Sequence, residues 1–279
     1  MECGVEGVRV HAMTLVQPSP RLTAWRLVMG ISLLAWYVKY PLQTKVFFQN
    51  GENLIYEHSL IPDWLCRPDV GALAYLLPGM SVLALWSRRL LWLQMAGVLH
   101  AVGSLIMLWH VQSYNDATHV TAFWTGLWLW WWAGQVNKRD GASLWHGISL
   151  AMGVLSLCWL GGAVGKLTSE YWEGEPFYYL YFMDKPQFPF SYWREHLSNE
   201  QIHTMARWFS RAVVVSECVL ATGFLWPARL AAVAGLLTLT GMVIISQLQL
   251  FSVLGPLMGL SIAVAWLVEK ESAATQPHS

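Results

Sequence analysis

The chain has 279 residues, of which 55% are hydrophobic and 12% charged, and its mean hydropathy is +0.39. A single water-soluble core of this size cannot hide so much apolar surface, so the composition excludes an ordinary soluble domain and indicates an integral membrane protein. The formal net charge is zero at pH 7, which argues against a nucleic-acid partner and against an acidic solvating tail.

The first 20 residues are expected to form a cytoplasmic tail. They carry Glu2, Glu6 and Arg9, and they lack the apolar core and small-residue cleavage site of a secretory signal peptide. We therefore expect no cleaved signal. The expected organisation is a tail over 1–20, a transmembrane domain over 21–268 and a second cytoplasmic tail over 269–279.

Apolar stretches of about 20 residues, the length of a membrane-crossing helix, recur along the chain. They predict an all-α bundle of about eight transmembrane helices with two longer loops, at 41–68 and 165–206. Little besides 246–249 separates the last two stretches, so one re-entrant hairpin could replace them. The expected helices are 22–40, 69–87, 89–110, 117–135, 143–164, 207–226, 228–247 and 250–268.

The orientation follows from the basic residues of the short loops. Arg88, Arg89, Lys138, Arg139 and Arg229 all fall on one side of an eight-helix arrangement. The positive-inside rule places that side, with both termini, in the cytoplasm. The expected location is the cell (inner) membrane. Both long loops would then lie on the extracytoplasmic face.

Ionisable side chains within the predicted helices usually face the bundle interior, because each costs at least about 2.5 kcal/mol in hydrocarbon. His100 and Glu217 lie near the middle of their predicted helices. Each fits either a structural hydrogen bond between helices or a role in a ligand cavity. For Glu217 we expect burial in both cases.

Two histidines are expected at the outer rim of the bundle, at about the depth of Lys166. His110 ends the third predicted helix and His119 begins the fourth. Either could simply be solvated, but two histidines on different helices at matching depth could also hold a haem, so that interpretation stays open. The four cysteines are far apart and form no C-x-x-C pair, and we predict no metal site.

The segment 161–167 is the most informative part of the sequence. It places small residues at a helix end directly before Lys166, and Tyr171 and Trp172 follow. Small residues let neighbouring backbones approach closely, so the lysine would stand at the mouth of any cavity in the bundle. The alternative is an interface lysine that only meets lipid headgroups.

These motifs resemble those of the HTTM (horizontally transferred transmembrane) family, whose membrane domain is shared by vitamin K-dependent gamma-carboxylases. The most specific similarity surrounds Lys166: small residues, Lys-Leu, aromatic residues and then Gly174, eight positions after the lysine. The segments 26–30, 113–119 and 249–252 resemble the family's first helix, the entry into its central helix and its Leu-Phe-Ser segment.

The resemblance implies a membrane enzyme in which Lys166 is the base that deprotonates a hydroquinone. Molecular oxygen then adds, and the oxygenated product attacks an inert C–H bond. The expected cofactor is a quinone or hydroquinone, and the expected substrate is a peptide or small molecule at the extracytoplasmic face. The candidate site residues are Lys166, His119 and His110 for catalysis, and Trp172, Tyr171, Glu217 and His100 for the cofactor.

The sequence also departs from the carboxylases. It has Ile244-Ile245 where they have a Phe-His pair, Tyr171 at the place of a family tryptophan, and it ends at Ser279 where they continue into a large substrate-gripping region. We therefore expect the chemistry of the membrane half alone. Two other functions stay open: a non-enzymatic membrane partner, such as an immunity, anchoring or assembly subunit, and a quinone-reactive electron-transfer subunit.

Overall fold

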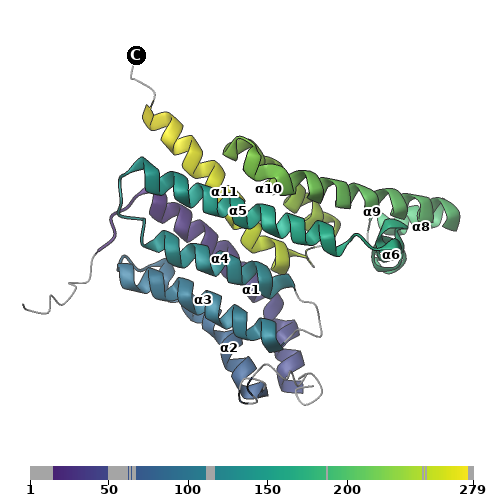
Figure 1. The fold of residues 1–279 in the computed structure, drawn as a ribbon. Coiled ribbons are helices and arrows are strands. Elements are labelled where there is room, and N and C mark those ends of the chain that lie inside the picture. Colours follow the sequence, from purple (N-terminus) through teal and green to yellow (C-terminus); the bar gives the residue numbers. More distant parts are fainter. Residues whose placement is uncertain are drawn as a thin grey trace, which may run out of the picture. The chain divides into compact units, whose positions relative to one another are not determined.

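A computed structural model describes residues 15–49, 62, 64, 67–110, 117–186, 188–246, 248 and 250–275, with the backbone alone for 40–49, 68, 110, 274 and 275. Across these residues the chain is helical and has no β-strand, which confirms the expected all-α class (Figure 1). Backbone contacts cluster into two compact units, residues 1–147 and 148–279.

Five helices in the described part of the chain are long and apolar enough to cross a membrane. Their length and composition are those of segments that satisfy their backbone hydrogen bonds within hydrocarbon. The protein is therefore an all-α integral membrane protein. The five segments are Leu90–Trp109, Gly141–Gly165, Asn199–Leu225, Ala228–Ile245 and Phe251–Ala273.

Eight membrane crossings stay a prediction, because three of the expected helices fall short of this pattern. Helix α1 (Pro20–Gln49) is long but carries Arg21 and Arg26 among its apolar residues. Helix α2 (Pro68–Met80) has only 13 residues before it tightens into a 3₁₀ turn, and α4 (Ala117–Ala133) has 17. Each is shorter or more polar than a typical crossing of about 20 apolar residues.

Helix α10 (Ala228–Ile245) has the surface that contact with lipid requires. Leu230, Leu237 and Ile244 recur every seven residues along one face and are 59%, 68% and 68% exposed. Such a stripe would be unfavourable in water, but it costs nothing against lipid tails. Helix α10 packs along α11 (Phe251–Thr275), so the last two apolar stretches form two helices, each of crossing length.

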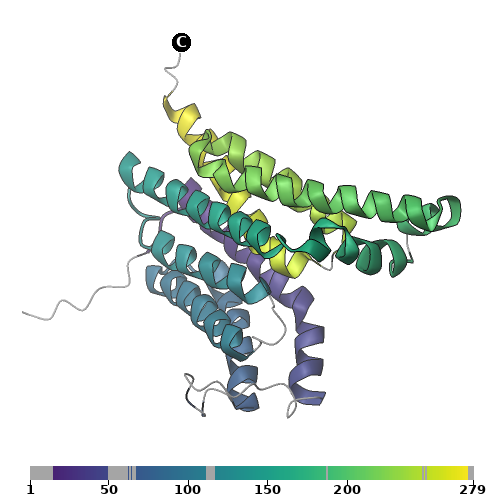
Figure 2. The ribbon, with the colours of Figure 1, turned by 45° about the vertical axis from the view of Figure 1, so that its right-hand side comes forward.

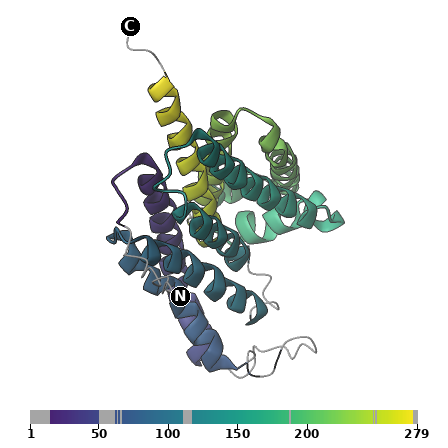
Figure 3. The ribbon, with the colours of Figure 1, turned by 60° about the vertical axis from the view of Figure 1, so that its left-hand side comes forward.

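In the first unit, α1 to α4 pack as a ring in which α1 and α3 (Leu90–His110) each contact α2 and α4. The indole of Trp36 in α1 donates to the carbonyl of Tyr75 in α2 at 2.9 Å, and the Tyr75 hydroxyl donates back to the Trp36 carbonyl at 3.2 Å. Helices α3 and α4 run side by side (Figures 1 and 3). They meet at Gly97, where a Cβ atom would lie 2.4 Å from the backbone nitrogen of Trp130.

The second unit contains the long helix α9 (Asn199–Ala221), which begins eight residues before the predicted boundary at 207. A capping box starts it: the Ser198 hydroxyl accepts from the Gln201 backbone N–H, and the Gln201 side chain accepts from the Ser198 backbone N–H. The predicted boundary was wrong because the first two turns are polar and fall outside an apolar window. Helix α9 ends in a 3₁₀ turn over Thr222–Leu225.

The predicted loop 165–206 is largely helical. Between α5 (Gly141–Gly165) and α9, residues 169–196 form a set of short helices, here called the helical cap, which lies along the first half of α9 (Figure 2). The cap comprises α6 (Ser169–Trp172), α7 (Glu175–Phe177), the π-helix η5 (Tyr178–Met183) and α8 (Phe190–His196). The predicted loop 41–68 also begins as helix, because α1 continues to Gln49.

Candidate functional site

An ion pair joins the end of α5 to α9. Lys166 is the first residue after α5, and its Nζ donates to both carboxylate oxygens of Glu217 at 2.8 Å and to the Gly162 carbonyl at 3.1 Å. The side chain of Glu217 is 6% exposed and that of Lys166 is 26% exposed. The expected burial of Glu217 is therefore confirmed, and its negative charge has a cation as its partner.

Gly162 makes room for this pair. A Cβ atom at position 162 would lie 3.2 Å from Oε2 of Glu217 and 3.3 Å from its Oε1 and Cδ. The neighbouring Gly161 has open space around the corresponding position. Of the two glycines, only Gly162 therefore faces the carboxylate, and it alone makes room for this contact.

Tyr171 is the third member of the site. Lys166 Nζ lies 5.9 Å from the centroid of the Tyr171 ring, within the range of a cation–π contact. Burial raises the pKa of the Tyr171 phenol, and the charge of Glu217 and the neighbouring Tyr181 raise it further. The phenol is therefore protonated at neutral pH and can donate a hydrogen bond beside the ion pair.

The helical cap holds Tyr171 in place through backbone contact with α9. Gly174 has a φ of +88°, and a Cβ there would lie 2.5 Å from the backbone nitrogen of Arg207. Only glycine satisfies both conditions. The Ser210 hydroxyl donates to the Tyr171 carbonyl, and the Thr168 hydroxyl caps α6 by accepting from the Tyr171 N–H at 3.3 Å.

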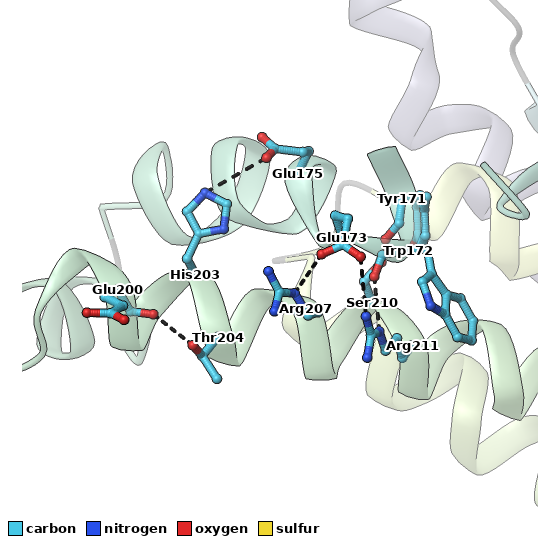
Figure 4. Close-up of polar contacts among 10 residues, drawn as sticks. All are labelled: Tyr171, Trp172, Glu173, Glu175, Glu200, His203, Thr204, Arg207, Ser210 and Arg211. Atoms are coloured by element: carbon cyan, nitrogen blue, oxygen red, sulfur yellow. Dashed lines mark hydrogen bonds and ion pairs between the residues drawn. The ribbon is translucent and has the colours of Figure 1, made fainter. Parts of the chain in front are cut away.

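Charged side chains fasten the outer side of the same junction, as Figure 4 shows. Glu173 in the cap lies between two arginines of α9: Arg207 Nε is 2.9 Å from its Oε2, without hydrogen-bond geometry, and Arg211 Nη2 is 3.4 Å from its Oε1. Arg211 also donates to the Trp172 carbonyl at 3.1 Å and lies 5.1 Å from the Trp172 ring. Single exposed ion pairs contribute little, but together these contacts fix the cap on α9.

Aromatic packing forms the interior of the cap. Phe182 is fully buried, and the Tyr181 and Phe177 rings stack with their centroids 5.0 Å apart. Tyr171 meets the edge of Phe177 at 6.1 Å, so it connects the ion pair to this apolar cluster. The buried residues of the cluster are Phe177, Phe182, Phe190, Ile202 and Ala206.

The structure thus brings together three of the predicted site residues, Lys166, Glu217 and Tyr171. Trp172 follows Tyr171 in the chain but lies on the exposed side of the junction, 40% accessible and against Arg211. The sequence placed Lys166 at a membrane face and Glu217 in mid-helix. They meet because the lysine stem reaches back one turn to the Gly162 carbonyl.

The predicted histidines belong to the first unit. His100 is 1% exposed and His119 is 4% exposed, and the His119 ring meets the edge of Tyr75 at 6.4 Å. His110 ends α3, and its side chain lies outside the described residues. The expected proximity of His110 and His119 to Lys166 stays a prediction. Among the described residues, no group of three or more His, Cys, Asp or Glu side chains could hold a metal ion.

Sequence reasoning missed the contact between Lys166 and Glu217, although a signal for it was present. A carboxylate within a membrane helix needs a cation or several donors, and Lys166 is a basic residue at the end of a predicted helix.

Comparisons with protein-family models, with curated proteins and with solved structures give no match, so the resemblance to the HTTM family stays a prediction.

Proposed function

We propose that the protein is a membrane enzyme in which Lys166 and Glu217 together remove a proton from a hydroquinone-like compound. The observation that carries this proposal is the contact of one lysine amine with both oxygens of a buried carboxylate, beside a protonated phenol. A lysine, a carboxylate and a phenol gathered at one helix end are typical of catalytic sites. The positive-inside pattern supports placing this site at the extracytoplasmic face, with both termini in the cytoplasm.

The pair offers a route by which a lysine can act as a base. The ammonium proton passes to Glu217 across the 2.8 Å hydrogen bond, which leaves a neutral amine and a carboxylic acid. An apolar compound that excludes water from the site favours this neutral pair over the ion pair. The Lys166 amine then accepts the O–H proton, and the resulting ammonium stabilises the anion while Glu217 holds the second proton.

The aromatic side chains near the pair support a flat apolar ring as its ligand. Tyr171 presents a phenol on one side of Lys166, and the aromatic cluster of the helical cap continues from it. When bound, a hydroquinone would supply the acidic O–H group and the reducing electrons for subsequent reaction with oxygen. The residues of this chain would orient the ring, exclude water and move the proton.

Substitution of Lys166 tests the proposal. In lipid vesicles containing a reduced quinone, we expect Lys166→Arg and Lys166→Ala each to abolish quinone-dependent oxygen uptake, because a guanidinium stays protonated at any accessible pH. Raising the pH should not rescue the Arg variant. Lys270→Arg, at an exposed position over Trp266, is the matched control and should keep full activity. Substantial activity in Lys166→Arg would refute the role of Lys166 as the base.

The ion pair also favours a second candidate, a non-enzymatic membrane partner in which it merely staples α5 to α9. The double variant Lys166→Glu/Glu217→Lys separates the two functions. If the ion pair only holds α5 against α9, the protein should regain most of its thermal stability when the charges are exchanged. If the protein is an enzyme, it should stay inactive because the amine is misplaced. A quinone that co-purifies with the wild-type protein would support the enzyme, and haem absorbance would instead support an electron-transfer subunit.

A further inference from the structure

The centre of the first unit contains polar side chains that the packing leaves without partners. His100 in α3, Ser32 in α1 and Thr125 in α4 are each at most 1% exposed. Among the residues that the structure describes, neither ring nitrogen of His100 and neither hydroxyl has a hydrogen-bond partner. Unpaired polar groups are unfavourable in any interior, and most of all inside hydrocarbon. Three of them in one helix bundle indicate a bound molecule that pairs with them.

His100 and Thr125 lie at the same level of the bundle. The backbones of α3 and α4 touch where a Cβ at Gly126 would lie 2.6 Å from the backbone nitrogen of Ala101. His100 and Thr125 directly precede these two residues in the sequence. The imidazole and the hydroxyl therefore project from adjacent backbones.

Ser32 reaches the same level from α1. The Trp25 indole donates to the Leu129 carbonyl at 3.0 Å, and the Trp132 indole donates to the Arg21 carbonyl at 3.0 Å. Because the earlier residue of α1 meets the later residue of α4, the two helices run antiparallel. Ser32 lies two turns beyond Trp25, about 10 Å along the helix, and Thr125 lies about 6 Å from Leu129 in the same direction. The two hydroxyls are therefore within about one helical turn of each other in height.

We propose that His100, Ser32 and Thr125 form a buried binding site for water, in which one or more molecules bridge the imidazole and the two hydroxyls. A neutral imidazole offers one donor and one acceptor, each hydroxyl offers both, and water complements all of them. This water would give His100 an exchange partner for its proton within the membrane. The proposal is independent of the function of Lys166.

Other occupants fit the site less well. A metal ion would need further His, Cys, Asp or Glu ligands, and the described residues contain no group of three or more. A ring-sized organic ligand would have to separate α3 from α4, whose backbones are in contact at this level. A cation would lack a carboxylate to balance its charge, since all three proposed ligands are neutral.

The sign of a stability change tests the proposal. Thr125→Val keeps the shape of the side chain and removes its hydroxyl. At a hydrated site the bridging water loses a partner, so we expect the Tm in lipid nanodiscs to fall by about 2–4 °C. At a dry site the variant removes an unpaired buried hydroxyl, and the Tm should rise. Thr125→Ser, which keeps the hydroxyl, is the matched control and should preserve the water signal described next.

Solid-state NMR of histidine-labelled protein in lipid bilayers provides the direct readout. The His100 ring signals are assigned by their loss in His100→Phe. We expect magnetisation transfer from water to this ring, reduced at least twofold in Ser32→Ala/Thr125→Val. Absence of transfer in the wild-type protein, or a rise in Tm of Thr125→Val, would overturn the proposal. So would a Tm increase on adding Zn²⁺ that His100→Phe abolishes, because the site would then hold a metal.

Discussion

The two units bury polarity in different ways. The first unit buries one guanidinium, that of Arg21, which donates to the Ser143 hydroxyl and to two backbone carbonyls. At its centre it also buries neutral groups, His100 with the hydroxyls of Ser32 and Thr125, which find no hydrogen-bond partners among the described residues. The second unit buries a charge, and Glu217 has Lys166 in direct contact with both oxygens. The difference follows from cost: a neutral polar group can be paired by a small bound molecule, whereas a buried carboxylate needs a cation or several donors from the protein.

The largest effect should come from leaving the charge of the second unit without its partner. Glu217→Leu should destabilise the protein by about 3 kcal/mol, the lower end for a broken buried pair, because Lys166 is partly exposed and can turn toward water. Thermal unfolding in detergent measures the loss. Glu217→Leu/Lys166→Met should recover most of it, and equal stability of wild type and Glu217→Leu would contradict the importance of the pair.

Gly174→Ala should have the next largest effect. The variant forces a Cβ into a left-handed backbone conformation and against the backbone of Arg207, at a cost of about 1–3 kcal/mol. Because the helical cap carries Tyr171, activity should fall together with the Tm. Gly161→Ala, with open space around its Cβ, is the control and should leave the Tm unchanged or slightly raised. Similar Tm values for the two variants would show that the cap is not held at Gly174.

Gly162→Ala should lower stability less than Gly174→Ala does, and its main effect should be on activity. The new methyl group would press on the Glu217 carboxylate at 3.2–3.3 Å, and the carboxylate must move by a few tenths of an ångström. Stability should fall by less than about 1 kcal/mol, while kcat should drop because the proton passes between Lys166 and Glu217. Gly161→Ala again serves as the control. A wild-type kcat in Gly162→Ala would show that catalysis does not depend on the geometry of the pair.

The smallest expected effect is a change in how thermal stability depends on alkaline pH. Because burial raises the pKa of Tyr171 in the folded protein, the unfolded chain loses that proton first, near pH 10. The stability that Tyr171 contributes is therefore fully present below about pH 10 and is lost as the pH rises toward the folded pKa. Tm profiles from pH 8 to 11 should fall less steeply for Tyr171→Phe than for wild type. Parallel profiles would place the phenol in water rather than beside Glu217.

Much of this arrangement could be predicted from the sequence, because hydropathy reports on the solvent that each segment meets. The apolar stretches predicted the helical membrane class, and the segment before Lys166 predicted a helix end there, where α5 does end. The start of α9 was wrong, since its polar first turns depend on a capping box rather than on hydropathy. The pairing of Lys166 with Glu217 was missed, because a contact across 51 residues depends on tertiary packing.

The sequence also could not predict which of the Tyr171 and Trp172 side chains points toward the ion pair. Both are aromatic neighbours in one short helix, and only the docking of the helical cap separates them. Tyr171 turns toward the ion pair, while Trp172 covers the guanidinium of Arg211. Sequence spacing gives the angle between two side chains of a helix, but the surface on which the helix docks decides which of them points inward.

Gly174 offers a way to find other proteins of this architecture when overall similarity is too low to align. Its positive φ and its contact with Arg207 exclude every side chain, and the cap must return to α9 a fixed number of residues after Lys166. The template has three parts: a lysine at the end of an apolar helix, a glycine eight positions later, and then a helix that begins polar, becomes apolar and carries a carboxylate. This template is defined by stereochemistry. Distant sequences can be screened for this spacing without any requirement for conserved apolar residues.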